Sequence, residues 1–371
     1  MKLFECQSCG QPLYFENTRC EVCEHRLGYL SAEGTLSALE PEGDASAGIW
    51  RALARPDGAT FRFCSNAEYD ACNWLLPADA AETLCIACRH NRTIPDLSVA
   101  ENLRRWRKLE QAKHYLFYTL LKFKLPMPTR EEDPQEGLCF DFLADTTDAQ
   151  GNVTRVLTGH EHGIITLNID EADDAAREKR RVAMKEPYRT LIGHFRHEIA
   201  HYYWDRLVRD DPPVLERYRA LFGDERLDYS ESLQHHYANP PPADWQEQFV
   251  STYATAHSWE DFAETWAHYL HIVDTLETAR AFGLKVRPRI RKGYQLKAEV
   301  DFSPYRHGDI EELIDVWLPL TLAVNSMNRS MGQPDLYPFV ISPKVVEKLG
   351  FMHDLIHRVP MQADAPAKSA A

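Results

Sequence analysis

Apolar residues recur at helical spacing between residues 98 and 124. Ser98 and Glu101 form the pattern of a capping box, in which two side chains satisfy the first free amides of a helix. The apolar stripe behind this pair consists of Leu103, Trp106, Leu109, Leu116, Leu120 and Phe123. Pro126 and Pro128 cannot continue a helix. The pattern therefore predicts one amphipathic helix that ends near Lys124 and packs its stripe into a core.

The period of the pattern shortens after residue 138. Three apolar segments are predicted to be strands: Leu138–Leu143, Val153–Leu157 and Gly163–Ile169. A charged segment, 171–185, then leads to a helix expected to start near Pro187, and the chain beyond Asp210 is mostly helical by period. Short strands followed by a run of helices predict an α+β fold.

The first 95 residues differ from the rest in composition. Residues 31–60 are rich in Ala, Gly, Ser and Glu, which predicts a linker or a loosely ordered loop. The Ala-rich end of the chain predicts a disordered tail. We expect a cysteine-rich module at 1–95, one larger domain at 96–360 and a tail at 361–371.

Composition narrows the class of protein. Hydrophobic residues make up 44% of the 371 positions and charged residues 26%, which excludes a fully disordered or fibrous chain. Pro319 interrupts the most apolar stretch, and the N-terminus has no apolar segment of the signal-peptide kind. The net charge of −14 weighs against nucleic-acid binding. A cytoplasmic protein without membrane association is expected.

Cysteines cluster at the N-terminus. In a reducing compartment, clustered cysteines usually bind metal instead of forming disulfides. Two CxxC units, ten residues apart, supply four thiolates for one tetrahedral zinc site: Cys6, Cys9, Cys20 and Cys23. Free thiols or a redox pair are the alternative.

A second, more loosely spaced cysteine cluster follows. It predicts a second structural zinc site formed by Cys64, Cys72, Cys85 and Cys88. His90 is a substitute ligand, and the alternative is a few buried cysteines beside one reactive pair. The ninth cysteine, Cys139, is expected to be a small buried apolar residue. Residues 1–95 hold eight Lys or Arg against thirteen Asp or Glu, so this module is read as structural or as a docking surface for another protein.

The helix expected after Pro187 carries an HExxH motif. It places His197 and His201 one turn apart, where their imidazoles converge on one metal ion. Glu198 lies on the same side, as a general base for an attacking water and then as a general acid. His194 and Asp205 fall on that side too, and Asp205 is expected to fix a ligand imidazole by a hydrogen bond.

A catalytic zinc needs a third protein ligand. The metzincin extension is absent, because Trp204 and Leu207 stand where that pattern has Gly and His. Glu260 and Glu264 share one face of a later helix, so one can bind the metal while the other braces a histidine. Glu260 is favoured as the ligand. The remaining alternatives are Glu264, His257 and His268.

These motifs resemble two families. The HExxH, followed by a Tyr seven residues before the first Glu of an ExFAE motif, resembles the gluzincin peptidases related to anthrax lethal factor. That resemblance implies Glu260 as ligand, Glu264 as the residue behind a ligand histidine and Tyr253 as the donor that stabilises the transition state. Asp261 departs from it, because the toxin family has an aromatic residue there.

The second resemblance covers most of the chain. Segments such as CQSCGQPLYFENTRCEVC, CIACRHNRTIPDLS, EPYRTLIGHFRHEIAHYYWDRLV and WEDFAETWAHYLH resemble the bacterial zinc-binding metallopeptidases that carry an N-terminal zinc ribbon. This resemblance implies a zincin-like domain behind a zinc-ribbon module.

The sequence therefore predicts a zinc peptidase that hydrolyses peptide or other amide bonds, with one catalytic and two structural Zn(II) ions. Strand 163–169 is expected to pair with an extended peptide substrate. The alternatives are a non-enzymatic, zinc-dependent adaptor with an inactive zincin domain and, more weakly, a nucleic-acid-binding ribbon protein.

Overall fold

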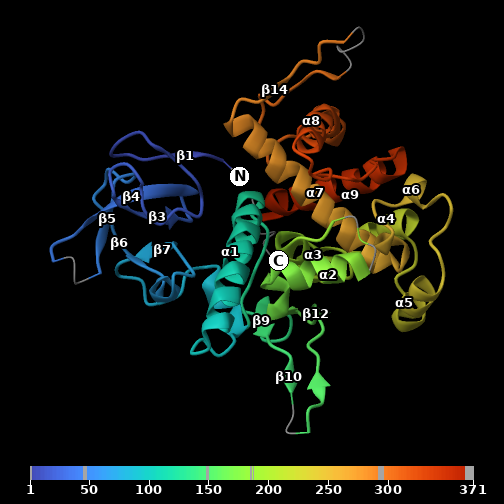
Figure 1. Cartoon of the computed structure of the whole chain (residues 1–371), viewed down its shortest axis with the longest axis horizontal. Coiled ribbons are helices and arrows are strands. Elements are labelled where there is room, and N and C mark those ends of the chain that lie inside the picture. The colour runs from blue at the N-terminus through green and yellow to red at the C-terminus, as the bar shows by residue number, and fades with distance from the viewer. Residues whose placement is uncertain are drawn as a thin grey trace, which may run out of the picture. The chain divides into compact units, whose positions relative to one another are not determined.

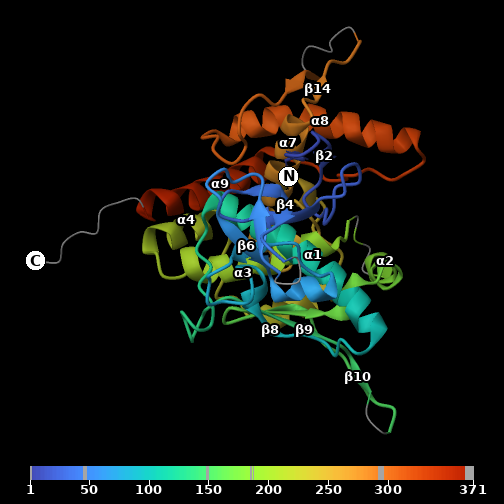
Figure 2. The same ribbon diagram turned by 90° about the vertical axis from the view of Figure 1, so that its left-hand side faces the viewer.

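The chain forms two compact units (Figures 1 and 2). The computed structural model describes residues 2–44, 48–147, 150–183, 186, 188–290 and 296–363. Unit 1 comprises 1–122, 126–185 and 189–195, and unit 2 comprises 123–125, 186–188 and 196–371.

The N-terminal part of unit 1 is built from short antiparallel strands. A hairpin of β1 (Phe4–Glu5) and β2 (Pro12–Leu13) carries the first cysteine pair on its loop. An antiparallel sheet follows, in the order β3 (Arg26–Leu30), β4 (Thr35–Pro41), β5 (Trp50–Ala52), β6 (Thr60–Phe63) and β7 (Leu75–Pro77). Its core cluster contains Leu30, Leu39, Ala52, Phe61 and Leu75.

The expected linker at 31–60 is wrong. This segment contributes β4, β5 and the first residue of β6, and Leu36, Ala38 and Leu39 are buried. Ala, Gly and Glu are depleted in strands, but β4 buries its apolar residues and pairs with β3 and with β5, so packing outweighs the local preference.

A long helix and a second sheet complete unit 1. The helix α1 (Ala100–Phe123) packs on the sheet through Phe117 and Phe140. The sheet has the order β12 (Gly159–Glu161), β13 (Ile164–Asn168), β9 (Cys139–Leu143) and β8 (Asn91–Thr93), and β9 is parallel to both of its neighbours. A two-stranded ribbon of β10 (Thr146–Thr147) and β11 (Val153–Thr154) extends from it, and α2 (Asp174–Ala183) follows.

Three expectations about unit 1 need correction. Ser98 does not open a capping box, because its amide and hydroxyl both donate to Asp96 and the helix begins at Ala100. The strand expected at 153–157 is only two residues long. The strand expected to receive a substrate, β13, is an interior strand bonded to β12 and to β9, so its backbone groups already have partners on both sides.

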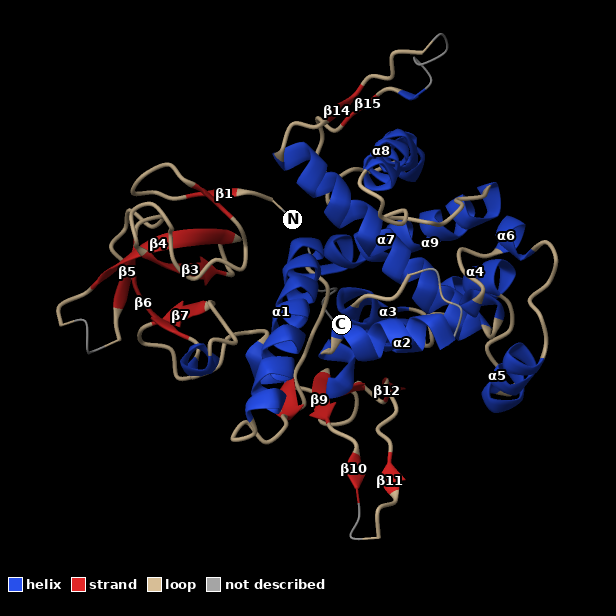
Figure 3. Ribbon diagram, in the orientation of Figure 1, coloured by secondary structure: helices blue, strands red, loops and turns tan. Residues whose placement is uncertain are grey.

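Unit 2 is almost entirely helical (Figure 3). The helix α3 (Leu191–Leu207) begins in unit 1 and continues into unit 2, while Pro187 lies outside the described residues. It is followed by α4 (Pro212–Phe222), α5 (Tyr229–Ala238), α6 (Trp245–Gln248), α7 (Ser258–Ala281), α8 (Ile310–Ser330) and α9 (Pro343–Ala363), with a hairpin of β14 (Lys285–Val286) and β15 (Ala298–Glu299) between α7 and α8.

The helix α7 lies at the centre of unit 2. It packs against α4, α8 and α9, and most of its aromatic and aliphatic residues are buried. Among the described helices, none combines the length and the apolar character that crossing a bilayer requires. Of the tail expected at 361–371, residues 361–363 continue α9 and 364–371 lie outside the described residues.

Candidate metal centres and active site

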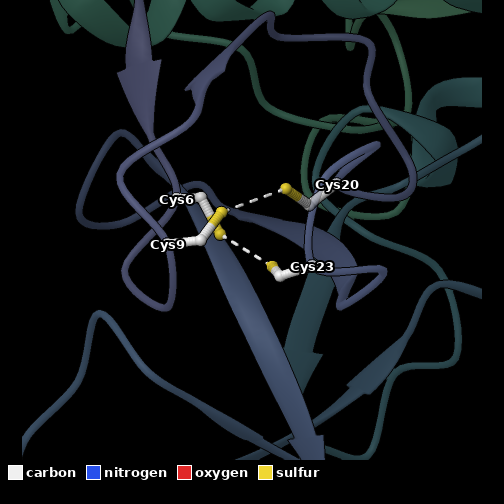
Figure 4. A group of neighbouring side chains, drawn as sticks. All are labelled: Cys6, Cys9, Cys20 and Cys23. Atoms are coloured by element: carbon white, nitrogen blue, oxygen red, sulfur yellow. Dashed lines mark hydrogen bonds between the residues drawn. The ribbon is translucent and has the colours of Figure 1, made fainter.

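The first cysteine cluster forms a compact four-sulfur group (Figure 4). The Sγ atoms of Cys6 and Cys23 are 3.5 Å apart, and those of Cys9 and Cys20 are 3.6 Å apart. Each CxxC turn closes with a backbone hydrogen bond, from Gly10 to Cys6 and from Glu24 to Cys20. Gly10 has a φ of 76°, a conformation that glycine adopts without strain. Four thiols at these distances suit a tetrahedral metal ion.

The second cluster is fully buried. The thiols of Cys64, Cys72, Cys85 and Cys88 lie within 4.8 Å of one another. His90, the substitute ligand expected from the sequence, has its two ring nitrogens 2.7 Å and 3.0 Å from the carbonyl oxygens of Ile86 and Met127. Because both ring nitrogens contact backbone carbonyls, His90 does not act as a ligand together with the sulfurs in this structure.

The HExxH histidines meet a carboxylate from α7. His197 and His201 lie one turn apart on α3, with ring centroids separated by 5.1 Å. Glu260 lies in the first turn of α7, and its Oε2 is 2.9 Å from His197 Nε2 while its Oε1 is 3.8 Å from His201 Nε2. The side chain of Glu260 is only 2% exposed. One atom from each of these residues can therefore face a common point.

Glu264 lies behind this group. Its Oε1 accepts a hydrogen bond from His197 Nδ1 at 2.8 Å, and its Oε2 accepts one from Ser251 Oγ at 2.6 Å. Because Nδ1 carries the proton, the lone pair of His197 is on Nε2, the nitrogen that faces Glu260.

The three residues fit a divalent metal ion. Glu260 Oε2 is buried without a hydrogen-bond donor, and it faces a ring nitrogen that has no proton in the neutral tautomer. Two lone pairs at 2.9 Å repel each other unless a cation lies between them. Burial lowers the pKa of His201 to about 4, which keeps this imidazole neutral and able to bind metal near pH 7.

The carboxylate is held ionised. Burial alone would raise the pKa of Glu260, but the neighbouring His201 and His197 outweigh this effect and lower the pKa to about 2. Burial alone would lower the pKa of His197, but Glu260 and Glu264 outweigh it and raise that pKa. In the absence of metal, a proton takes the place of the cation at His197.

Two tyrosines lie beside these residues. The ring of Tyr253 is 5.8 Å from that of His197. The hydroxyl of Tyr229, the first residue of α5, donates to Glu260 Oε1 at 2.7 Å. Burial raises the pKa of Tyr229 and of Tyr253, and the charges of Glu260 and Glu198 add to this effect, so both phenols stay protonated and can donate.

The family of the chain follows from comparison with known proteins. Residues 102–355 match a family model described as "Putative zinc-binding metallo-peptidase", and residues 3–99 match a zinc-ribbon domain. The chain belongs to this metallopeptidase family. Uncharacterized proteins of Mycobacterium tuberculosis and Mycobacterium bovis are each 42% identical over 359 residues, which is 97% of this chain and 96% of each relative. No solved structure matches the chain.

Membership in this zinc-binding metallopeptidase family confirms the second resemblance and the predicted fold class, an α+β chain with a zinc ribbon before a metallopeptidase domain. The family also supports zinc as the metal. The likeness to the peptidases related to anthrax lethal factor stays a prediction.

Four residues of this metallopeptidase, which the sequence placed near the metal site, form contacts with residues other than the proposed metal ligands. Asp205 pairs with Arg209 at 3.2 Å, and His194 pairs with Glu171 at 3.2 Å. His257 caps α7 by accepting from the amide of Trp259, and its Nε2 lies 3.2 Å from the carbonyl of Leu227. His268 Nδ1 lies 2.6 Å from the hydroxyl of Tyr337. His257 and His268 are thus used in packing unit 2 and do not join the group around Glu260.

No feature of the sequence indicated that Tyr229 and Ser251 belong to the site. Neither belongs to a motif, and Tyr229 lies 31 positions before the carboxylate that it contacts. One local feature of the sequence bears on the position of Tyr229. Asp228 caps α5 and fixes the start of the helix, so Tyr229 is held at a helix terminus.

Proposed function

We propose that the protein is a zinc-dependent peptidase that hydrolyses peptide or other amide bonds. The observation that carries the proposal is the convergence of His197, His201 and Glu260 within 4.8 Å on two helices, with Glu198 in the same motif. A zinc ion held by these three residues supplies Lewis acidity, which activates water and polarises the substrate carbonyl.

The chain's own residues supply the proton transfers. Glu198 takes a proton from the attacking water and later delivers it to the leaving amine. Its side chain is largely buried, with 9% of the residue exposed. Glu264 holds His197 in the tautomer that can bind metal. Asp205, further along the same helix, is proposed to orient a ligand imidazole in addition to its ion pair with Arg209.

Tyr253 is the proposed donor to the oxyanion. A tetrahedral intermediate places negative charge on the former carbonyl oxygen, and a phenol in a water-poor site stabilises that charge. The raised pKa of Tyr253 keeps its proton in place for this task.

The proposal extends to the whole chain. We place the zinc-ribbon module at 1–95 and the catalytic domain at 96–360, with Zn(II) in both cysteine clusters as structural ions. We propose a cytoplasmic location, where clustered cysteines bind zinc instead of forming disulfides. Peptides or proteins are the proposed substrates, and the acidic module is a proposed docking surface for a protein partner.

A cleavage assay tests the proposed activity. A mixture of quenched fluorescent peptides is incubated with the protein as purified, after chelation, and after zinc is restored. We expect cleavage that chelation abolishes and that zinc restores. Cleavage that persists in chelator at full strength would contradict a metal-dependent reaction.

Metal content gives an independent prediction. We expect about three zinc ions per chain, two bound by thiolates and one by the HExxH site. Elemental analysis of protein purified without added metal measures this number, and chelators should remove the open histidine site first. A content near one ion would contradict at least one cysteine centre.

The two tyrosines should give different phenotypes. Replacing Tyr253 with Phe removes only a hydroxyl, so we expect kcat to fall ~10²–10³-fold with little change in KM or zinc content. Replacing Tyr229 with Phe removes a hydrogen bond to Glu260, so we expect zinc affinity to fall ~10–100-fold. Steady-state kinetics at saturating zinc and chelator competition separate the two effects. An unchanged kcat with a lower melting temperature would assign Tyr253 to packing alone.

A further inference from the structure

The second cysteine cluster has a fifth donor that comes from outside the cysteine-rich segment. His114, in the middle of α1, is 4% exposed, and its Nε2 lies 3.3 Å from Cys72 Sγ and 3.6 Å from Cys88 Sγ. The same nitrogen is 4.0 Å from Cys85 Sγ. The imidazole therefore lies against the face of the cluster that Cys72, Cys85 and Cys88 form.

The other ring nitrogen fixes how this imidazole can act. His114 Nδ1 is 2.6 Å from the backbone carbonyl oxygen of Glu110, one turn earlier on α1. A carbonyl oxygen only accepts hydrogen bonds, so Nδ1 carries the proton and the neutral ring has its lone pair on Nε2. That lone pair is buried and directed at three sulfurs. If the sulfurs are thiolates, the lone pair needs a cation beside it, either a metal ion that it binds or a proton that makes Nε2 a donor to the sulfurs.

The distances match a tetrahedral centre with three sulfurs and one nitrogen. Zinc bonds of about 2.3 Å to sulfur and 2.0–2.1 Å to nitrogen give tetrahedron edges of about 3.8 Å between sulfurs and about 3.6 Å between sulfur and nitrogen. The Sγ atoms of Cys72 and Cys85 are 3.8 Å apart, and the three distances from His114 Nε2 lie on both sides of the second value.

Five donors exceed the four that a structural zinc ion takes. Cys64 and Cys72 each accept a backbone amide, from Cys85 at 3.3 Å and from Trp74 at 3.4 Å, so these contacts do not separate the two thiols. His114 Nε2 contacts Cys72, Cys85 and Cys88, which leaves Cys64 as the fourth thiol. Glu110 is also near, since Cys88 Sγ lies 3.5 Å from its Oε2, but its Oε1 already accepts from Asn91 and from Lys113, both at 2.8 Å. His114 Nε2 lies 3.3–4.0 Å from three sulfurs, whereas the contact of Glu110 Oε2 is with one, that of Cys88.

We propose that His114 is a zinc ligand of the second centre, together with Cys72, Cys85 and Cys88, while Cys64 is the remaining thiol beside the site. This assignment rests on the proposal that the second cluster binds zinc. Its consequence is a link between the two family segments. The cysteines lie within residues 3–99, which match the zinc ribbon, and His114 lies within residues 102–355, which match the metallopeptidase. One metal ion then ties the ribbon to the first helix of the peptidase segment.

Cadmium-113 NMR of the full chain tests the ligand set directly. The protein is produced with nitrogen-15 histidine and its zinc is exchanged for cadmium-113. The first cluster is an internal standard, because it holds four cysteines and no histidine in its metal-capable group. We expect a resonance shifted away from this four-sulfur signal and split by one-bond coupling to a single histidine nitrogen. The site of His197, His201 and Glu260 would give a separate resonance, coupled to two histidine nitrogens. Two unsplit four-sulfur signals would overturn the proposal, as would the absence of any signal beyond those of the first cluster and the histidine site.

Substitutions give a second, independent reading. We expect His114→Ala and Cys72→Ser each to lower the zinc content by about one ion per chain, and Cys64→Ser to retain it. His90→Ala is the matched control, since His90 is a comparably buried histidine with 2% exposure that contacts carbonyls instead of sulfurs. The first-cluster cadmium signal reports whether each variant still folds there. If Cys64→Ser loses the ion and His114→Ala keeps it, the centre is held by the four cysteines and His114 is not a ligand.

The NMR result also separates this proposal from the proposed peptidase activity. A split second resonance in a protein that cleaves no peptide would leave the ligand assignment standing and the activity refuted. A cleaving enzyme with two unsplit four-sulfur signals would give the opposite result.

Discussion

Replacing Glu198 with Gln should abolish most peptide hydrolysis while leaving zinc in place. The substitution keeps the size of the side chain and removes its ability to exchange a proton. General acid–base groups contribute ~10²–10⁴-fold to rate, so we expect kcat/KM to fall by at least that factor. The proposed zinc ligands are His197, His201 and Glu260, so the metal content of the variant should equal that of the wild type.

The matched control is Glu231→Gln, the same chemical change at an exposed position on α5. It should retain full activity. Kinetics with a fluorogenic peptide and elemental analysis of both variants measure the two quantities. Loss of zinc from the Glu198 variant would mean that Glu198 binds metal and that the assignment of roles is wrong.

Replacing Glu260 with Ala should empty the histidine site. Glu260 Oε2 is the carboxylate oxygen nearest to His197 Nε2, at 2.9 Å, and without it the ion keeps only two neutral protein ligands. Replacing Glu264 with Ala should weaken zinc binding less, by the ~10–100-fold typical of a residue that supports a ligand. The order follows from the geometry, because Glu264 contacts His197 through Nδ1, the nitrogen turned away from Glu260.

Competition with a chromophoric chelator measures both affinities, and melting curves of the zinc-free proteins show whether either substitution unfolds unit 2. Because both carboxylates are buried, Glu260→Gln and Glu264→Gln serve as variants that preserve volume. A larger loss of zinc from the Glu264 variants than from the Glu260 variants would move the ligand one turn along α7.

Local sequence predicted the features that depend on local spacing. The HExxH pair needs only the helical period, and the i,i+4 spacing of Glu260 and Glu264 needs only that α7 is a helix. The CxxC turns and the helix of residues 100–123 belong to the same category. In each case the periodicity of one element fixes which side chains share a face.

The sequence pattern did not predict contacts between segments that are distant along the chain. Tyr229 reaches Glu260 from another helix, Ser251 reaches Glu264 from a loop, and His114 reaches cysteines up to 42 positions away. Strand 163–169 illustrates the same limit, because its sequence predicts extended backbone but not whether the strand lies at an edge of the sheet. The pattern of side chains along the chain predicts secondary structure. Which distant segments become neighbours in space depends on the topology of the fold.

Hydrolysis in oxygen-18 water tests the central claim most directly. A library of defined peptides is incubated with zinc-loaded protein in the labelled water, and mass spectrometry searches for new C-termini that carry oxygen-18. The account predicts labelled C-termini with the wild type, none above background with Glu198→Gln, and full zinc occupancy of the histidine site in both. Fully zinc-loaded wild type that yields no more labelled C-termini than the Glu198 variant, across the whole library, would contradict a peptidase and favour a zinc-dependent adaptor.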